Sequence, residues 1–370
     1  MFSGEGVRKE LPFLILFIVV SAFFIFLFTN KEDVMEPFAA EGFIKKWLLN
    51  ENQTLATYIK ESESEDEDLV KGRETLSETL GLWMEYVYQK DDKEHFEEAY
   101  GILDNYFLEE NGFVHWKLAE TGKSEVSTNA LVDDLRISHV LFQASEKWHE
   151  KKYEDAAIRI GEYIAKYNLY QNVLTDFYDR KYEYARPIIT LSYIEPEAIN
   201  VLEDMNLLNE GTYEKTMGIL KDAPSDGPFF PKAYDVKQRK YMYDKDINLI
   251  DQSLVALYRA KSGYPTKKYA SFIKKEFAKN GVIFGKYNRI TGEPSVDYES
   301  PAIYGWLILF CVEIGENELA KGLFKEMVKF QSKDSDYYGG YSVYYDDTHI
   351  FDNLVPLLAE RKLYDTGILE

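Results

Sequence analysis

Segments with the 3.6-residue period of amphipathic helices follow one another from residue 76 to residue 360, and this succession limits the possible folds most strongly. Short turns rich in Gly, Asn, Asp and Pro separate the segments. Long runs of alternating apolar and polar residues are missing, and the β-like pieces 112–117 and 339–345 fall in connections. The pattern predicts an all-α fold, with helices at 76–89, 93–108, 130–150, 153–167, 196–205, 213–221, 247–261, 266–280, 302–314, 316–330 and 349–360.

The helices are predicted to form pairs, because three segments (95–99, 152–156 and 317–320) share an aromatic or aliphatic residue, an acid and then Ala. Ala99 and Ala156 are about 57 positions apart, and no period of ~34 residues connects the segments, which argues against a tetratricopeptide array. About 300 residues divided among six pairs gives a spacing of this size. We therefore expect an (α/α)6 toroid of six inner and six outer helices, with one cleft where the inner helices end.

Residues 11–28 form an uncharged apolar run of nearly the ~20 residues that a membrane-spanning helix needs. Arg8 and Lys9 precede the run and mostly acidic residues follow it, so the positive-inside rule places the N-terminus in the cytoplasm. A cleaved signal peptide is the alternative, but the run exceeds the usual apolar region of such peptides and no A-x-A site follows at once. We expect an uncleaved single-pass anchor in the cell membrane with the rest of the chain extracytoplasmic.

The predicted organisation has four parts. Residues 1–10 are cytoplasmic, 11–28 are the transmembrane anchor, 29–68 are a linker with a leading helix, and 69–370 are the toroid. The leading helix is expected at 43–60, and the acidic stretch 61–68 is expected to be a solvated link because its charges repel one another.

Charge and cysteine content exclude several classes of function. The 43 Lys and Arg residues stand against 64 Asp and Glu residues, and a net charge of −21 repels nucleic acid. Cys311 is the single cysteine, so an intramolecular disulfide, a four-thiolate metal site and a lipobox are all excluded. The five histidines are scattered without a metal-binding motif, and we predict neither a metal nor another cofactor.

A carboxylate interrupts the apolar stripe of the helix expected at 130–150. Asp134 lies in line with Ile137, Leu141 and Trp148 at helical spacing. An ionised carboxylate on a packed face is costly unless it is paired. A functional role is therefore one explanation, and a structural partner such as Arg136 or Lys147 is the other.

This stretch resembles the signature of glycoside hydrolase family 8, A-[ST]-D-[AG]-D-x-x-[IM]-A-x-[SA], continued by aliphatic residues and x-A-x-x-x-[FW]. Matching offsets are occupied by Asp134, Ile137, Leu141, Ala144 and Trp148. The chain departs from the first half of the signature. The segment 127–130 resembles the A-[ST]-D-[AG] portion, but an insertion displaces it and Asn129 stands in place of the Asp. Without a gap Val132 stands at the first Asp position, which leaves Asp133 and Asp134 as substitutes.

A second match lies upstream, where SETLGLWMEYVYQKDDKEHFEEAY resembles the family's S-E-G-Q-x-Y-G-M segment and the helix after it. Glu78 then matches the general acid of the family. Periodicity alone places Glu78 with Glu85 opposite the apolar stripe, as an ordinary solvated glutamate. The following FVHWKL resembles the aromatic strand of the family, and Trp116 becomes a candidate platform for a sugar ring.

The third match is looser and concerns the general base. RPIITLSYIEPEA (186–198) resembles L-N-P-S-Y-x-x-P, and MYDKDINLIDQSL (242–254) resembles the base-bearing Y-D-A-x-R-x-P. Tyr243 and Asp244 align, whereas Asn248 replaces the Arg, and Asp246 and Asp251 compete for the role of base. In the structural alternative, Asp244 or Asp246 is merely the N-cap of the helix that begins near 247.

The resemblance implies an inverting hydrolase with catalytic residues Glu78 and Asp244 or Asp246. It further implies a sugar-binding set, to which tyrosines of the loops around 337–338 and 344–345 are added as possible stacking partners: Asp133, Asp134, Trp116, Asn129 and Tyr243. We expect a membrane-anchored extracytoplasmic enzyme that cleaves a polysaccharide, such as an exopolysaccharide or a cell-envelope glycan. The alternatives are a catalytically inactive toroid that binds a polysaccharide or an export protein, and a helical scaffold in the envelope.

Overall fold

The computed structural model describes residues 36–62, 69–124 and 126–370. The chain divides into two compact units, Met1–Pro37 and Phe38–Glu370, and the description below concerns the second. The predicted transmembrane segment 11–28 lies outside the described residues. Within the described ranges, no helix combines the length and the apolar character needed to cross a membrane.

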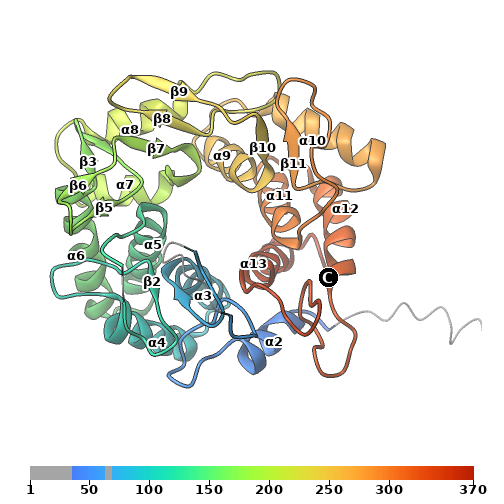
Figure 1. The fold of residues 1–370 in the computed structure, drawn as a ribbon, viewed down its shortest axis with the longest axis horizontal. Helices are drawn as coiled ribbons and strands as arrows, with labels where there is room; N and C mark the ends of the chain where they lie inside the picture. Colours follow the sequence, from blue (N-terminus) through green and yellow to red (C-terminus); the bar gives the residue numbers. More distant parts are fainter. Residues whose placement is uncertain (1–35, 63–68, 125) are drawn as a thin grey trace, which may run out of the picture. The chain divides into compact units, whose positions relative to one another are not determined.

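Five long helices and one shorter helix form an inner ring in the second unit (Figure 1). Neighbouring helices of the ring pack against one another. The 3-10 turn η2 (Leu191–Tyr193), which precedes the shortest inner helix, packs against α5 and α9. The inner helices are α3 (Ser77–Gln89), α5 (Leu131–Trp148), α7 (Pro196–Asp204), α9 (Leu249–Lys261), α11 (Pro301–Glu313) and α13 (Phe351–Asp365).

Each inner helix is accompanied by an amphipathic helix on the outside of the ring (Figure 1). The outer helices are α4 (Lys93–Ile102), which η1 (Leu103–Phe107) extends, α6 (Lys151–Tyr167), α8 (Thr212–Lys221), α10 (Lys267–Asn280), α12 (Asn317–Met327), which η3 (Val328–Phe330) extends, and α2 (Ala39–Trp47). The described residues thus contain twelve α-helices, and the predicted all-α double ring is confirmed.

The leading helix α2 supplies the outer partner of α13, so the ring closes with the first helix of the described residues. Ala40, Phe43 and Ile44 of α2 are buried in the common core. The helix expected at 43–60 ends at Trp47, because Arg73 holds the following segment in an irregular path. The Arg73 guanidinium donates to the carbonyl oxygens of Leu49 at 2.7 Å and Ile59 at 2.8 Å, which satisfies backbone groups that a helix would have paired.

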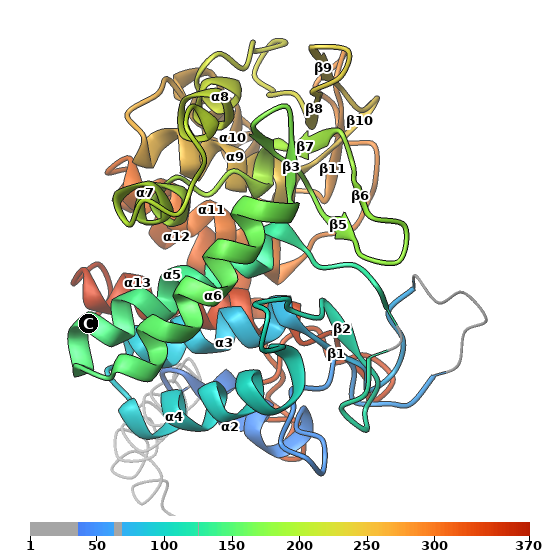
Figure 2. The same cartoon turned by 90° about the vertical axis from the view of Figure 1, so that its left-hand side faces the viewer.

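Short antiparallel strands of two or three residues lie in the connections, more of them than the sequence indicated. Figure 2 shows that they gather on one side, where the inner helices begin. The paired strands are β1 (Thr75–Leu76) with β2 (Lys117–Leu118), β3 (Leu169–Tyr170) with β4 (Val173–Leu174), β5 (Tyr178–Asp179) with β6 (Tyr184–Ala185), β7 (Ile188–Thr190) with β8 (Ala233–Asp235), β8 with β9 (Lys240–Met242), and β10 (Asp246–Asn248) with β11 (Lys286–Asn288). Because β1 and β10 lead directly into α3 and α9, these pairs fix where the inner helices start.

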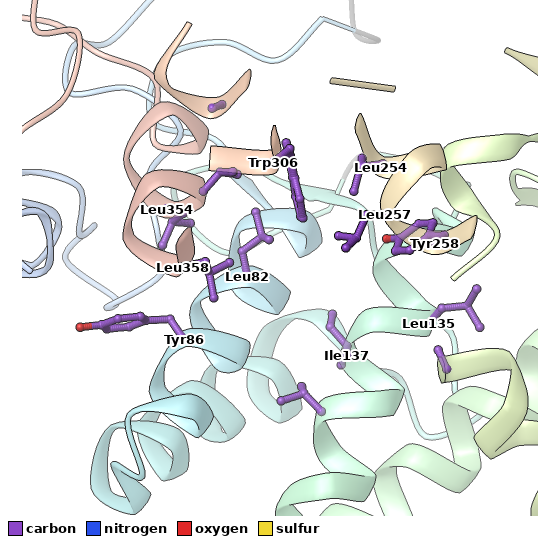
Figure 3. Close-up of a cluster of buried hydrophobic side chains, with 14 of the residues drawn as sticks. Leu82, Tyr86, Leu135, Ile137, Leu254, Leu257, Tyr258, Trp306, Leu354 and Leu358 are labelled. Carbon is purple, nitrogen blue, oxygen red and sulfur yellow. The ribbon is translucent and has the colours of Figure 1, made fainter. Parts of the chain in front are cut away.

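Buried side chains from α3, α5, α9, α11 and α13 meet between the inner helices (Figure 3). Leu82, Leu257 and Trp306 lie in this cluster, so the ring is packed with side chains. Gly305 lets α11 approach α13 closely, since a Cβ at this position would lie 2.8 Å from Cγ1 of Val355. Close packing of this kind holds the first turns of the inner helices in fixed relative positions.

Candidate active site

The first turns of three inner helices carry acids at the strand-bearing side. Glu78 lies in the first turn of α3, Asp133 and Asp134 in that of α5, and Asp251 in that of α9. The N-terminus of a helix favours negative charge, because its free backbone N–H groups carry partial positive charge. The ring therefore directs carboxylates from distant parts of the chain toward one region.

Glu78 is the acid that burial perturbs in the way a general acid requires. The pKa of Glu78 is raised to about 7, chiefly by loss of water and also by the charge of Asp133, against the opposing charge of Arg136. A carboxyl with this pKa is about half protonated at neutral pH. Glu78 is half-buried and not the fully solvated glutamate of the local interpretation, because it lies on an inner helix whose neighbouring residues Ser77 and Thr79 are buried.

A chain of hydrogen bonds fixes the start of α3 against the start of α5. The Ser77 N–H donates to the carbonyl oxygen of Trp116 at 3.0 Å, and the Ser77 hydroxyl donates to Asp133 Oδ2 at 2.8 Å. Gly81 brings the two helices close, since a Cβ there would lie 3.2 Å from Cδ of Arg136. Glu78 and Asp133 are thereby held beside each other.

Asp133 and Asp134 have different surroundings despite their adjacency. Arg136 Nη1 lies 3.5 Å from Asp133 Oδ1, whereas Asp134 accepts a hydrogen bond from Asn129 at 2.5 Å. Burial raises the pKa of Asp134 well above its usual range, and its second oxygen has no hydrogen-bond partner among the described residues. Burial therefore favours the protonated form of Asp134, and Asp133 is the member of the pair that lies beside Glu78.

Asn129 belongs to the same buried network as Asp134. Its amide also donates to Asn168 Oδ1 at 2.9 Å, and its oxygen accepts from the Tyr178 N–H at 2.8 Å. The expected partners of Asp134 are engaged elsewhere, because Arg136 binds Asp133 and Lys147 binds Asp91 at 2.7 Å. Asn129 and Asp134 together attach the first turn of α5 to β5.

Tyr193 is a central residue that the sequence analysis did not single out. Burial raises its pKa, and four acids contribute to the shift in the order Asp133, Asp176, Glu78 and Asp251. The tyrosine therefore lies among carboxylates from α3, α5, α9 and the connection after α6. Ser192 to Pro196 match the S-Y-x-x-P part of the family segment, which is the signal that could have identified this residue.

Asp176 and Asp251 extend the group of acids beyond Tyr193. Thr190 donates to Asp176 through its N–H at 2.6 Å and its hydroxyl at 3.0 Å, and Ser192 donates to Asp251 at 2.9 Å. Burial raises the pKa of both carboxyls. Asp251 was a competing candidate for the base, whereas no sequence pattern indicated Asp176.

Asp244 and Asp246 lie nearer to solvent than Asp251. Asp244 pairs with Lys232 at 3.0 Å, and the charge of Asp244 contributes to the raised pKa of Asp251, so the two carboxylates are neighbours. Asp246 is exposed at the start of β10, where it faces Asn288. The interpretation of either residue as an N-cap is wrong, because Asn248 caps α9 by accepting from the Ile250 N–H at 2.8 Å.

The aromatic candidates lie in different surroundings. Trp116 is half-buried next to Ser77, with Lys117 Nζ 5.4 Å from its ring centre. The Tyr243 hydroxyl donates a hydrogen bond to the main-chain carbonyl oxygen of Pro224 at 3.0 Å. The guanidinium of Arg289 lies over the Tyr243 ring. Tyr344 and Tyr345 are exposed, whereas Tyr337 packs on Trp47 with 5.0 Å between ring centres.

Comparison with known proteins identifies the family. No family model matches the chain. A protein of Bacillus subtilis (strain 168) named "Putative lipoprotein YdaJ" is 39% identical over 334 residues, which cover 90% of this chain and 88% of the relative. The chain belongs to the YdaJ family. The similarity to YdaJ extends over almost the whole length of both proteins.

Solved structures place the YdaJ-family fold among glycoside hydrolases. A novel alpha-amylase from Clostridium perfringens matches with a TM-score of 0.80 and 28% identity, covering 90% of this chain and 99% of the amylase. The endoglucanase Cel10 from Klebsiella pneumoniae, a family 8 glycosyl hydrolase, matches with a TM-score of 0.60 and 15% identity, covering 88% and 99%. The resemblance to glycoside hydrolase family 8 is confirmed at the level of the fold: this YdaJ-family protein has the (α/α)6 architecture of those enzymes.

Proposed function

We propose that the protein is a membrane-anchored, extracytoplasmic glycoside hydrolase that cleaves a polysaccharide with inversion at the anomeric carbon. The observation that carries the proposal is Glu78, whose pKa is raised to about 7 beside Asp133 where the inner helices of a glycosidase-type ring begin. A protonated carboxyl at neutral pH is the form that can donate to a glycosidic oxygen.

In the proposed reaction Glu78 donates its proton to the glycosidic oxygen as the bond to the anomeric carbon breaks. A water attacks that carbon from the other face of the sugar, and Asp244 accepts the proton that the water loses. Asp244 suits this role because it is half-exposed, pairs with Lys232 and adjoins the group of acids around Tyr193. Asp246 is the alternative base, and buried Asp251 is assigned to positioning through its bond with Ser192.

Substrate contacts are proposed for residues beside the acid. Asp133 would accept hydrogen bonds from sugar hydroxyls, and Trp116 would offer its ring face to a neighbouring sugar. Tyr193, which lies among the same acids, is added to this set. Asn129 and Asp134 bond to each other, and Asn129 also bonds to Asn168 and Tyr178, so we assign both to holding Asp133 in place. The Tyr243 hydroxyl already donates to a main-chain carbonyl, so we assign Tyr243 a peripheral contact at most.

The anchor is proposed to be the apolar segment 11–28, with the N-terminus cytoplasmic. The name of YdaJ describes a lipoprotein, which is also a protein held at a membrane. In this chain Cys311 lies buried within α11 and cannot carry a lipid there, so an apolar segment would replace the lipid. Protease added to intact cells should therefore digest the domain that follows the anchor.

Two measurements test the reaction and the base. Proton NMR of a fresh digest should show the product with the anomeric configuration opposite to that of the substrate, and retention would overturn the inverting mechanism. Asp244→Asn should lower kcat at least 100-fold, whereas Asp246→Asn should change kcat less than tenfold. The reverse order would make Asp246 the base.

The departure from the family signature favours a second function, a catalytically inactive ring that binds a polysaccharide. Val132 stands where the ungapped signature has Asp. The two functions differ in one result: a binding protein would retain a polysaccharide in a pull-down without releasing reducing ends, and Glu78→Gln would not change that retention.

A further inference from the structure

A second polar site lies at the other end of the inner helices. A cavity of about 260 Å³ is lined by residues of α3, α5, α9 and α13 and by residues at the start of α7. The cavity is separate from the candidate active site. Its lining residue Glu85 lies about two helical turns after Glu78 on α3. The side chains that matter here are Glu85, Arg136, His139, Glu195, Glu197 and Lys261.

Three of these side chains form a cluster with the chemistry of a metal site. One ligand atom each from His139, Glu195 and Glu197 lies within 4.8 Å of the others. His139 comes from the middle of α5, Glu195 is the N-cap of α7, and Glu197 lies in its first turn after Pro196. An imidazole nitrogen with two carboxylate oxygens is a donor set that suits zinc and related transition-metal ions.

Glu195 supplies an independent observation, because one of its oxygens lacks a partner. The residue is 9% exposed, and its Oε1 lies 3.6 Å from His139 Nδ1. Its Oε2 is buried without any hydrogen bond among the described residues. A buried carboxylate oxygen without a partner is costly in a folded protein, and a bound cation would satisfy it.

Arg136, Lys261 and Lys362 line the cavity with positive charge, and Lys261 is the one that pairs with a proposed ligand. Its ammonium forms a short ion pair with Glu197, and the charges of Glu197, Glu195 and Glu85 raise the pKa of Lys261 against the effect of burial. The ammonium does not reach Glu195 Oε2, which stays without a partner. A cation that binds all three ligands would therefore compete with Lys261 for the Glu197 carboxylate.

We propose that His139, Glu195 and Glu197 bind one divalent transition-metal ion of the zinc type, in competition with the ammonium of Lys261. The site goes beyond the proposed hydrolysis, in which no metal takes part. It would connect the middle of α5 to the start of α7, the shortest helix of the inner ring. Water would complete the coordination.

The test is calorimetric titration of zinc chloride into the full chain in detergent after chelator treatment. We expect one zinc ion per chain and a Kd at least 100-fold lower than for calcium. His139→Ala and Glu195→Gln should each raise the Kd for zinc at least tenfold. His115→Ala is the matched control and should leave the Kd unchanged, because His115 faces a single carboxylate, Glu109, at 3.0 Å.

Lys261→Met separates the competing occupants. If the ammonium competes with the metal, this variant should bind zinc at least tenfold more tightly than the natural protein, and zinc should raise the melting temperature of both but not of His139→Ala. Binding by Lys261→Met alone would show that Lys261 is the permanent occupant and would overturn the proposal. Absence of binding in both proteins, or binding that survives His139→Ala, would overturn it as well.

Discussion

At the scale of single residues, two neighbouring acids receive different properties from their surroundings. Both are buried, but Asp133 faces Glu78, Ser77 and Arg136, whereas Asp134 faces Asn129. The charge of Asp133 contributes to the raised pKa of Glu78. Asp133 thus adds to the effect of burial, which is the larger cause of the raised pKa of Glu78, while Asp134 supports the helix start.

Asp133→Asn should move the pH profile of hydrolysis. The variant removes a negative charge beside Glu78, so the pKa of Glu78 falls and the alkaline limb of kcat/KM shifts to lower pH. The shift should amount to about one pH unit or less, because burial is the larger cause. Initial rates from pH 5 to pH 9 check this, and an unchanged limb would show that Asp133 does not act on the acid.

Glu78→Gln should stabilise the fold at alkaline pH. The pKa of Glu78 is about 7 in the folded state against 4.5 as the ordinary value, so ionisation of Glu78 lowers the free energy of unfolding as pH rises between these values. Above pH 7 the full penalty applies, on the order of 1–3 kcal/mol. Urea unfolding should find the variant more stable at pH 8 and equal at pH 4.5; equal stability at both would contradict the burial of an ionisable Glu78.

At the scale of secondary-structure elements, the spacing of the inner helices decides whether the acids meet. Gly305 and Gly81 mark the closest approaches, of α11 to α13 and of α3 to α5. The helices themselves could be predicted from their periodicity. The end of α2 at Trp47 could not, because Arg73 controls it from a part of the chain that lies 26 positions away.

Gly305→Val should destabilise the ring. Even a Cβ at this position would lie 2.9 Å from the Val355 carbonyl oxygen, so the helices must separate, at a cost of about 1–3 kcal/mol. Gly218→Ala is the control, because Gly218 lies within α8 with no atom within 4 Å of the added Cβ, and it should stabilise by up to ~1 kcal/mol. Denaturant unfolding measures both, and equal effects would contradict the close packing of α11 on α13.

At the scale of the whole domain, the site combines residues from helices that are far apart in the sequence. The resemblance to family 8 predicted Glu78 as the general acid and identified the segment that contains Tyr193. Helical periodicity alone predicted a solvent-exposed Glu78. Asp176 had no recognisable signal, because its position depends on bonds to Thr190 that form only after folding. The cluster of His139 with Glu195 was equally hidden, since no local spacing connects α5 to α7.

The ring should depend on its N-terminal helix. A fragment that starts at residue 69 lacks α2, whose Phe43 is 2% exposed, and would expose the apolar face of α13. Loss of one buried aromatic ring alone costs about 3–5 kcal/mol. Thermal unfolding should show a cooperative transition for a fragment starting at residue 36 and a strongly lowered or absent one for the shorter fragment; equal melting temperatures would place α2 outside the folding unit.

The central claim is that Glu78 is the general acid of a polysaccharide hydrolase. The direct measurement is the release of reducing ends from a panel of polysaccharides, including α-glucans, β-glucans, xylans and amino-sugar polymers, by a fragment starting at residue 36. We expect the natural sequence to cleave at least one of them. We expect Glu78→Gln to lose at least 1,000-fold in kcat, and Glu94→Gln, which changes an exposed first-turn glutamate of α4, to keep full activity. Equal activity of Glu78→Gln and the natural sequence would contradict the account.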